Sequence, residues 1–197
     1  MATTRPNKNI SDFKSKLIGG GARPNLFEVE LTTLPDRVTG WDADSFQFLC
    51  KAAALPAQTI ASIDVPFRGR IFKVAGDRTI DTWTVTVIND EDFVLRNAFE
   101  NWTQQIADLT TNLGATDPSA YMTNAKVFQL GRGSSKASTD SSGNENVVLK
   151  EYEFIDIFPT SVSAIDLSYD TGDTIEEYTV EFQVQSLNLA GAGSPNG

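Results

Sequence analysis

Four glutamates are the residues of this sequence whose type and spacing could do acid–base chemistry. Glu151 and Glu153 stand two apart in one segment, and Glu177 and Glu181 stand four apart in another. A pair of carboxylates about 5 to 9 Å apart is what a glycosidase requires. The same spacing is typical of strands whose alternate side chains face solvent, where charge is ordinary. An acid–base hydrolase therefore stays open as an alternative to a solvated sheet face.

The sequence has few residues for other kinds of catalysis. The 197-residue chain has no histidine and one cysteine, Cys50, so Ser-His and Cys-His pairs cannot form. Cys50 shares an alternating face with Phe46 and Phe48, which predicts a small core residue. The glycine-rich stretch 131–135 lacks the lysine of a phosphate-binding loop, and the acidic runs 42–44 and 170–173 lack calcium-loop spacing. We expect no enzyme, no cofactor and no metal.

The segment 74–109 organises the elements around these residues. Trp83, Val85 and Val87 alternate with polar residues, which predicts a strand with one buried face. Asn89 and Asp90 are placed to cap a helix that follows directly. Apolar residues recur through that helix at spacings of four and three, namely Leu95, Phe99, Trp102, Ile106 and Leu109. We expect the helix to bury this stripe against the sheet.

Further strands are predicted at residues 26–34, 46–52, 60–65, 67–74, 126–130, 147–158, 164–169 and 174–187, with the last two forming a hairpin. Pro66 and Pro159 are expected to end strands, because proline cannot donate to a ladder. The fold class is mainly β, an antiparallel sandwich or barrel of two packed sheets with one substantial flanking helix. One domain, residues 22–189, is expected between a flexible basic arm (1–21), with a short helix capped by Ser11, and a flexible tail (190–197).

Charge is unevenly spread over a chain of net charge −10. Residues 1–23 carry five basic residues against one acidic, and residues 140–197 carry eleven acidic against one basic. A second basic group consists of Arg68, Arg70, Lys73 and Arg78. This asymmetry favours self-association through unlike charges, or a solvated body with a basic arm. No run approaches the ~18 apolar residues of a membrane span, so no membrane insertion is expected.

Several short blocks, taken in series, resemble one family. They are ARPNLF at 22–27, CKAAALPA at 50–57, VAGDRT at 74–79, WTVTV at 83–87 followed by Asn89-Asp90, FPT at 158–160 and IDL at 165–167. Their order and spacing are similar to those of the tail tube proteins of contractile-tailed, myovirus-type bacteriophages. The resemblance covers about residues 22–187.

The resemblance implies a structural subunit without enzymatic activity. Six copies would form a ring, and rings would stack into a hollow tube that conducts double-stranded DNA during ejection. Expected partners are the tail sheath protein, baseplate hub proteins and the tape measure protein, in a virion component assembled in the host bacterial cytoplasm. The alternatives are the tube of a phage-derived contractile injection or type VI secretion-like device, and a carbohydrate-binding β-sandwich module, for which Trp41 and Tyr121 are the available aromatics.

Two hypotheses assign residues within such a tube. Glu177 and Glu181, together with Glu151 and Glu153, would line the bore or its rim, because carboxylates repel a phosphate backbone; the alternative is that they face outward solvent. The basic arm and residues 68–78 would meet acidic surfaces of neighbouring subunits, and Asp77 and Arg78 would alternatively form a local ion pair. The candidate interface residues are Arg23, Arg68, Arg70, Lys73, Asp77 and Arg78.

Overall fold

The computed structural model describes residues 9–17, 20–36, 38–132, 148–170 and 172–188. The strands are β1 (Phe27–Glu30), β2 (Cys50–Ala54), β3 (Gln58–Phe67), β4 (Arg70–Ile80), β5 (Trp83–Ile88), β6 (Thr123–Leu130), β7 (Val148–Val162) and β8 (Glu177–Asn188). The helices are α1 (Ile10–Lys16), α2 (Ala43–Leu49) and α3 (Val94–Ile106), with a short 3-10 helix at Pro118–Ala120. None of the helices in these ranges is long and apolar enough to cross a membrane.

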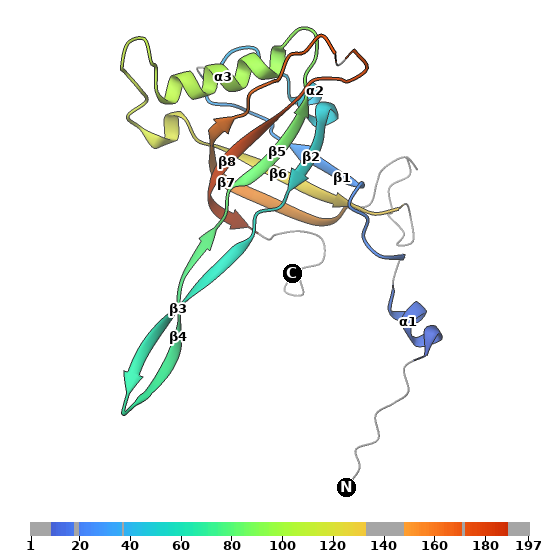
Figure 1. Ribbon diagram of the computed structural model, residues 1–197, viewed down its shortest axis with the longest axis vertical. Coiled ribbons are helices and arrows are strands. Elements are labelled where there is room, and N and C mark those ends of the chain that lie inside the picture. The colour runs from blue at the N-terminus through green and yellow to red at the C-terminus, as the bar shows by residue number, and fades with distance from the viewer. Residues whose placement is uncertain (1–8, 18–19, 37, 133–147, 171, 189–197) are drawn as a thin grey trace.

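Six strands form one antiparallel sheet in the order β1-β6-β7-β8-β5-β2. The sheet curls round its core until its two edges approach. A pocket between the edges is lined by Phe27, Val127 and Tyr152 on one side and by Ala53 and Leu55 on the other. The second sheet is the β3–β4 ribbon, which projects from the body (Figure 1). The expected mainly-β, barrel-like fold with one substantial helix is confirmed.

The core lies between α3 and the inner face of this sheet. In β5 the predicted residues Trp83, Val85 and Val87 are fully buried. The Trp83 ring lies between Phe154 and Phe182, with centroids 4.7 and 5.1 Å away. The buried residues that α3 contributes are Leu95, Ala98, Phe99 and Trp102. The sequence therefore predicted correctly which face of β5 and most of the α3 stripe are covered.

The expected start of α3 is wrong. The helix begins at Val94, and the residue before it, Phe93, has a left-handed backbone (φ 54°) and provides no side-chain cap. Asn89 stands five residues before Val94, too far to cap the helix. It is bound to the segment before β8 instead, donating its backbone N–H to the Glu176 carbonyl at 2.9 Å and its amide to the Glu176 carboxylate at 3.0 Å. At the other end, Leu109 lies beyond the helix and is 91% exposed.

The strand expected at 46–52 is instead α2 followed by β2. Asp42 caps α2, since its carboxylate accepts hydrogen bonds from the backbone N–H groups of Asp44 and Ser45. Phe46 and Cys50 are buried, whereas Phe48 is 84% exposed. The spacing of Phe46 and Cys50 fits one face of a helix as well as one face of a strand, so alternation alone could not decide.

The C-terminal hairpin expected across 170–173 does not form. Residues 164–169 contain no strand, and β8 pairs with β5 and β7 instead. Neither proline ends its strand. Pro159 lies inside β7 beside a register shift, and Pro66 lies in β3, whose only paired strand is β4. Proline has no backbone N–H to donate to a neighbouring strand, and it is tolerated at a register irregularity or in a strand with a free edge.

Candidate assembly surfaces

The metal-ligating and nucleophilic residue types are the first features to locate in the described part of the chain. The described residues contain no group of three or more His, Cys, Asp or Glu residues that could hold a metal ion. Cys50 is buried as expected, and desolvation raises the pKa of its thiol to about 12. A thiol with that pKa is almost wholly protonated near neutral pH and is a poor nucleophile.

The four candidate glutamates fall on two different walls of the body. Glu151 and Glu153 face outward on β7, opposite Phe128 and Lys126 of β6. Glu177 and Glu181 face outward on β8, opposite Ile88 and Thr84 of β5. Because the sheet curls round its core, these outward faces point in different directions. We call them the β1–β6–β7 wall and the β2–β5–β8 wall. The fold brings each pair together and separates the two pairs.

The β1–β6–β7 wall is strongly acidic. Lys126 of β6 lies among Glu30, Glu151 and Glu153, and its ammonium contacts Glu151 at 3.0 Å. The hydrogen bond and charge of Glu151, with smaller effects of Glu153 and Glu30, raise the pKa of Lys126. The Asn188 amide donates to Glu153 at 3.1 Å. One cation among three carboxylates leaves this surface negative.

The β1–β6–β7 wall also carries a groove of about 380 Å³ beside its edge strand. We call it the β1–α2 groove. The groove is lined by residues of β1, α2, β6 and β7 and by Thr32, two residues beyond β1. The full lining is Glu28, Glu30, Thr32, Ala43, Asp44, Gln47, Phe128 and Val148. The Gln47 amide donates to Glu28, and the Thr32 hydroxyl donates to Glu30 at 3.0 Å. No basic residue is in this lining.

The β2–β5–β8 wall is polar and smooth. Glu177 forms an ion pair with Lys51 of β2, and Glu181 is exposed beside Thr84. The other outward residues of β5 and β8 are small or amide-bearing, namely Thr86, Thr179, Gln183 and Gln185, apart from the half-buried Ile88. None of the outward residues of β5 and β8 is an exposed large apolar side chain. This wall therefore combines carboxylates with a surface that offers few apolar contacts to a ligand.

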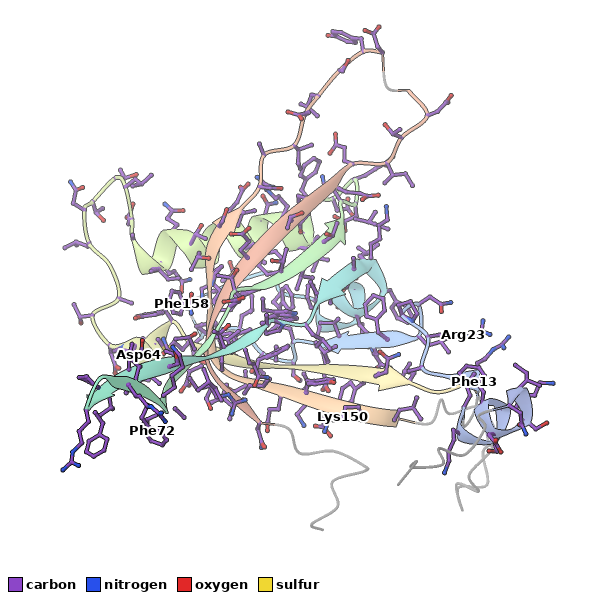
Figure 2. All side chains as sticks on the ribbon, turned by 60° about the horizontal axis from the view of Figure 1, so that its bottom comes forward. Phe13, Arg23, Asp64, Phe72, Lys150 and Phe158 are labelled. Carbon is purple, nitrogen blue, oxygen red and sulfur yellow. The ribbon has the colours of Figure 1, made fainter. Side chains whose placement is uncertain are left out.

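The β3–β4 ribbon carries a solvent-exposed apolar stripe. Its register sets Val65 opposite Phe72 and Ile63 opposite Val74, so these side chains share one face with Phe67. All five are exposed, as are Ile60 and Ile71 elsewhere on the ribbon. An exposed apolar face of this kind marks an interaction surface. Figure 2 shows Phe72 on the projecting ribbon, far from Arg23.

Five of the six candidate interface residues lie on this ribbon. Arg68 and Gly69 form its tip with φ of 46° and 80°, as a two-residue type I′ turn requires. The Arg68 guanidinium lies 5.4 Å from the centre of the Phe67 ring, and Arg70 is opposite Phe67. Lys73 forms an ion pair with Asp64 at 2.8 Å.

The remaining two ribbon candidates do not pair with each other. Arg78 donates to Gln58 across the ribbon, and no ion pair joins it to Asp77 within the described residues. Arg23, the sixth candidate, lies before β1, where its carbonyl accepts a hydrogen bond from Gln129 at 2.7 Å. Arg23 is therefore separate from the ribbon group.

Helix α1 is the third exposed feature. Asn9, not Ser11, caps it, in a reciprocal capping box with Asp12. Its large apolar residues Ile10 and Phe13 and its C-cap residue, Leu17, are exposed, and no residue of the helix is buried. The sequence predicted a short helix in an arm that meets neighbouring subunits. Sequence reasoning missed the exposed stripe of the ribbon, because periodicity shows that a face is apolar but not that its own subunit leaves it uncovered.

Comparisons with known proteins cover most of the chain. A family model described as phage tail tube protein matches residues 22–189. The chain is 36% identical over 162 residues to "Tail tube protein gp19" of Enterobacteria phage T4, covering 82% of this chain and 88% of the relative, and equally so to the phage T6 protein of that name.

Solved structures share the fold at low identity. The cap of the anti-feeding prophage matches with a TM-score of 0.59 and 17% identity, over 87% of this chain and 92% of that one. A chain of the sheath–tube complex of the extracellular contractile injection system PVC matches with a TM-score of 0.54 and 12% identity, over 94% and 100%.

Proposed function

The chain belongs to the phage tail tube protein family, and from this membership and its exposed surfaces we propose that it builds the hollow tube of a contractile phage tail. It is a structural protein and not an enzyme. Six copies form a ring, and rings stack into the tube. The observation that carries this proposal is the uncovered apolar stripe of the β3–β4 ribbon, which a monomer would leave in water.

The ribbon serves as a contact between subunits in this proposal. Its apolar face supplies the buried area, and the charged residues Arg68, Arg70, Lys73, Asp77 and Arg78 border it. Because the body of the protein is acidic, the arginines and lysine direct the ribbon to the surface of another copy rather than to another ribbon. Arg23 would act at a separate contact, with the N-terminal arm.

The β2–β5–β8 wall faces the bore in this proposal. DNA must slide past it, so a suitable wall repels phosphate and offers neither free cations nor aromatic platforms. Glu177 and Glu181 provide the negative charge, and the ammonium of Lys51 is neutralised by Glu177. The threonines alongside are short. Glu151 and Glu153 lie on the other wall and are proposed to face a neighbouring protein instead.

The partners follow from the same proposal. The sheath protein surrounds the tube, baseplate hub proteins start it, the tape measure protein occupies the bore before ejection, and double-stranded DNA passes through it afterwards. The subunit is a component of the virion and is assembled in the host bacterial cytoplasm. A phage tail is favoured over an injection device because the relatives at 36% identity are phage proteins, whereas the injection-device chains share only the fold.

The alternatives from other classes find little support. Trp41, a candidate sugar platform, packs edge-on against Phe99 with its ring 5.5 Å away, and its indole N–H donates to the Leu31 carbonyl at 2.9 Å. It is therefore part of the core. The hydrolase alternative required a pair of carboxylates in a cleft, but Glu151 and Glu153 face outward on β7 and Glu177 and Glu181 face outward on β8. One carboxylate of each pair is also neutralised by a lysine.

Electron microscopy of the purified full chain over a concentration series, with sedimentation in parallel, tests the proposal. We expect hexameric rings or hollow tubes, with Glu181 lining the bore in a reconstruction. Particles that stay monomeric at every concentration, even when preformed tube fragments are added as seeds, would refute it. A tube in which Glu181 faces outward would refute only the bore assignment.

A further inference from the structure

Helix α1 requires a covering surface that its own subunit does not supply in the structure. It has seven residues, and its apolar side chains Ile10 and Phe13 and that of its C-cap residue, Leu17, are 66%, 60% and 45% exposed. Isolated helices shorter than about 12 residues are marginal in water, and the Asn9 capping box contributes only about 1 kcal/mol. Figure 1 shows α1 standing away from the body.

The charges of α1 define what its partner must look like. At 3.6 residues per turn, Ile10, Phe13 and Leu17 fall on one stripe. Lys14 flanks the stripe on one side and Lys16 on the other, while residues 11, 12 and 15 fall on the far side. A complementary surface therefore has an apolar floor bordered by carboxylates.

The β1–α2 groove has this composition. Ala43, Phe128 and Val148 provide apolar lining, Glu28 and Glu30 of β1 provide carboxylates on one element, and Asp44 of α2 provides another. Asp44 is exposed at the first turn of α2. Glu30, Glu151 and Glu153 surround Lys126 next to the groove, so carboxylates also outnumber the ammonium there.

We propose that α1 of one copy docks in the β1–α2 groove of a neighbouring copy in the assembled tube. Phe13 contacts the groove floor, and Lys14 and Lys16 pair with Glu28, Glu30 or Asp44. This inference rests on the proposed function, because it needs an array of identical chains. The arm lies outside the family match, which begins at residue 22.

The other exposed surfaces match α1 less well. The β3–β4 ribbon is apolar but carries Arg68 and Arg70, which would repel the lysines of α1. The β2–β5–β8 wall is negative but exposes no large apolar residue on β5 or β8 to receive Phe13. The groove combines both required properties.

Cross-linking in the assembled state tests the contact. In a Cys50→Ser background, the full chain with Phe13→Cys and Val148→Cys is assembled and treated with a short bismaleimide. We expect a ladder of linked multimers on a denaturing gel. The matched control pairs Phe13→Cys with Leu109→Cys, whose side chain is exposed far along the chain from the groove, and should give no ladder above the single-cysteine backgrounds.

Two results would overturn the inference. A linked species that migrates as a monomer means that α1 occupies the groove of its own chain. Tubes that form normally with no link above the control mean that α1 binds elsewhere or nowhere. Both leave the proposed function intact, whereas wild-type protein that forms no rings or tubes contradicts the proposed function itself.

A charge exchange provides a second readout. Lys14→Gln with Lys16→Gln removes two positive charges and should raise the concentration needed for assembly roughly 5-fold to 10-fold, as expected for two exposed ion pairs. The matched control, Ser11→Glu with Ser15→Glu, changes the net charge equally on the far side of α1 and should leave assembly unchanged. Lys14→Glu with Lys16→Glu should be rescued by Glu30→Lys with Asp44→Lys. Equal effects of both helix pairs, or no rescue, would overturn the contact.

Discussion

Replacing Phe67 and Phe72 of the β3–β4 ribbon by serine should separate folding from assembly. Each phenylalanine is 66% exposed in the subunit. Full burial of such a side chain is worth about 1.5 to 3 kcal/mol, so about 1 to 2 kcal/mol per residue remains available to a contact between subunits. The pair would then weaken each ribbon contact by about 2 to 4 kcal/mol, or roughly 30-fold to 700-fold in its dissociation constant.

Sedimentation and electron microscopy over a concentration series measure this effect, and urea denaturation of the dilute protein measures stability. We expect Phe67→Ser with Phe72→Ser to abolish rings and tubes at concentrations where the wild type assembles, while the free energy of unfolding changes by less than about 1 kcal/mol. Phe48→Ser with Leu109→Ser is the control, because these side chains are still more exposed, at 84% and 91%, but lie off the ribbon.

Three outcomes would refute this reasoning. Assembly at the wild-type concentration would mean that the ribbon stripe is not an interface. A loss of more than about 2 kcal/mol of folding free energy would mean that the two phenylalanines pack within their own subunit in solution. Equal loss of assembly in the control would attribute the effect to general surface hydrophobicity.

Other changes test single features of the structure. Gly76→Val should disturb the ribbon and weaken assembly without changing the unfolding midpoint of the body, because an added Cβ would stand 3.1 Å from the Ala61 carbonyl oxygen. Trp102→Ala should cost about 3 to 5 kcal/mol in urea denaturation, since the indole is fully buried. Tyr178→Phe should leave stability unchanged or raise it by up to about 1 kcal/mol, because the buried hydroxyl has no hydrogen-bond partner among the described residues. Cys50 should react with maleimide at pH 8 only after unfolding, because the thiol is buried and desolvation raises its pKa; labelling in native buffer compared with labelling in urea measures this.

The elements that sequence predicted well are those whose pattern is local and whose partner lies inside the same subunit. In β5 the alternation of Trp83, Val85 and Val87 directly reports the buried face, and Leu95, Phe99 and Trp102 report the buried stripe of α3. The same reasoning placed Cys50 in the core correctly, although the strand predicted at residues 46–52 is mostly helix α2. The predicted burial of a residue can be correct when its predicted secondary structure is wrong, because residues four apart lie on the same face of a helix and of a strand.

What sequence could not predict depends on contacts between distant segments. Nothing local shows that β8 pairs with β5 and β7 rather than with residues 164–169. The division of the four glutamates also follows only from that pairing, because Glu151 and Glu181 both alternate outward yet stand on different walls of a curled sheet. The exposed stripe of the ribbon looked in sequence like any half-buried strand.

The distribution of charge over the exposed apolar surfaces restricts how copies can associate. The ribbon and α1 both carry an apolar stripe bordered by basic residues, including Arg68, Arg70, Lys14 and Lys16, while the walls of the body are acidic. Two ribbons or two α1 helices repel each other, so a two-fold contact between like surfaces is disfavoured. Each protrusion can instead bind a body surface of the next copy, which is a head-to-tail contact. Such contacts close into rings or continue as filaments, and both kinds of contact are needed by the stack of rings that we propose.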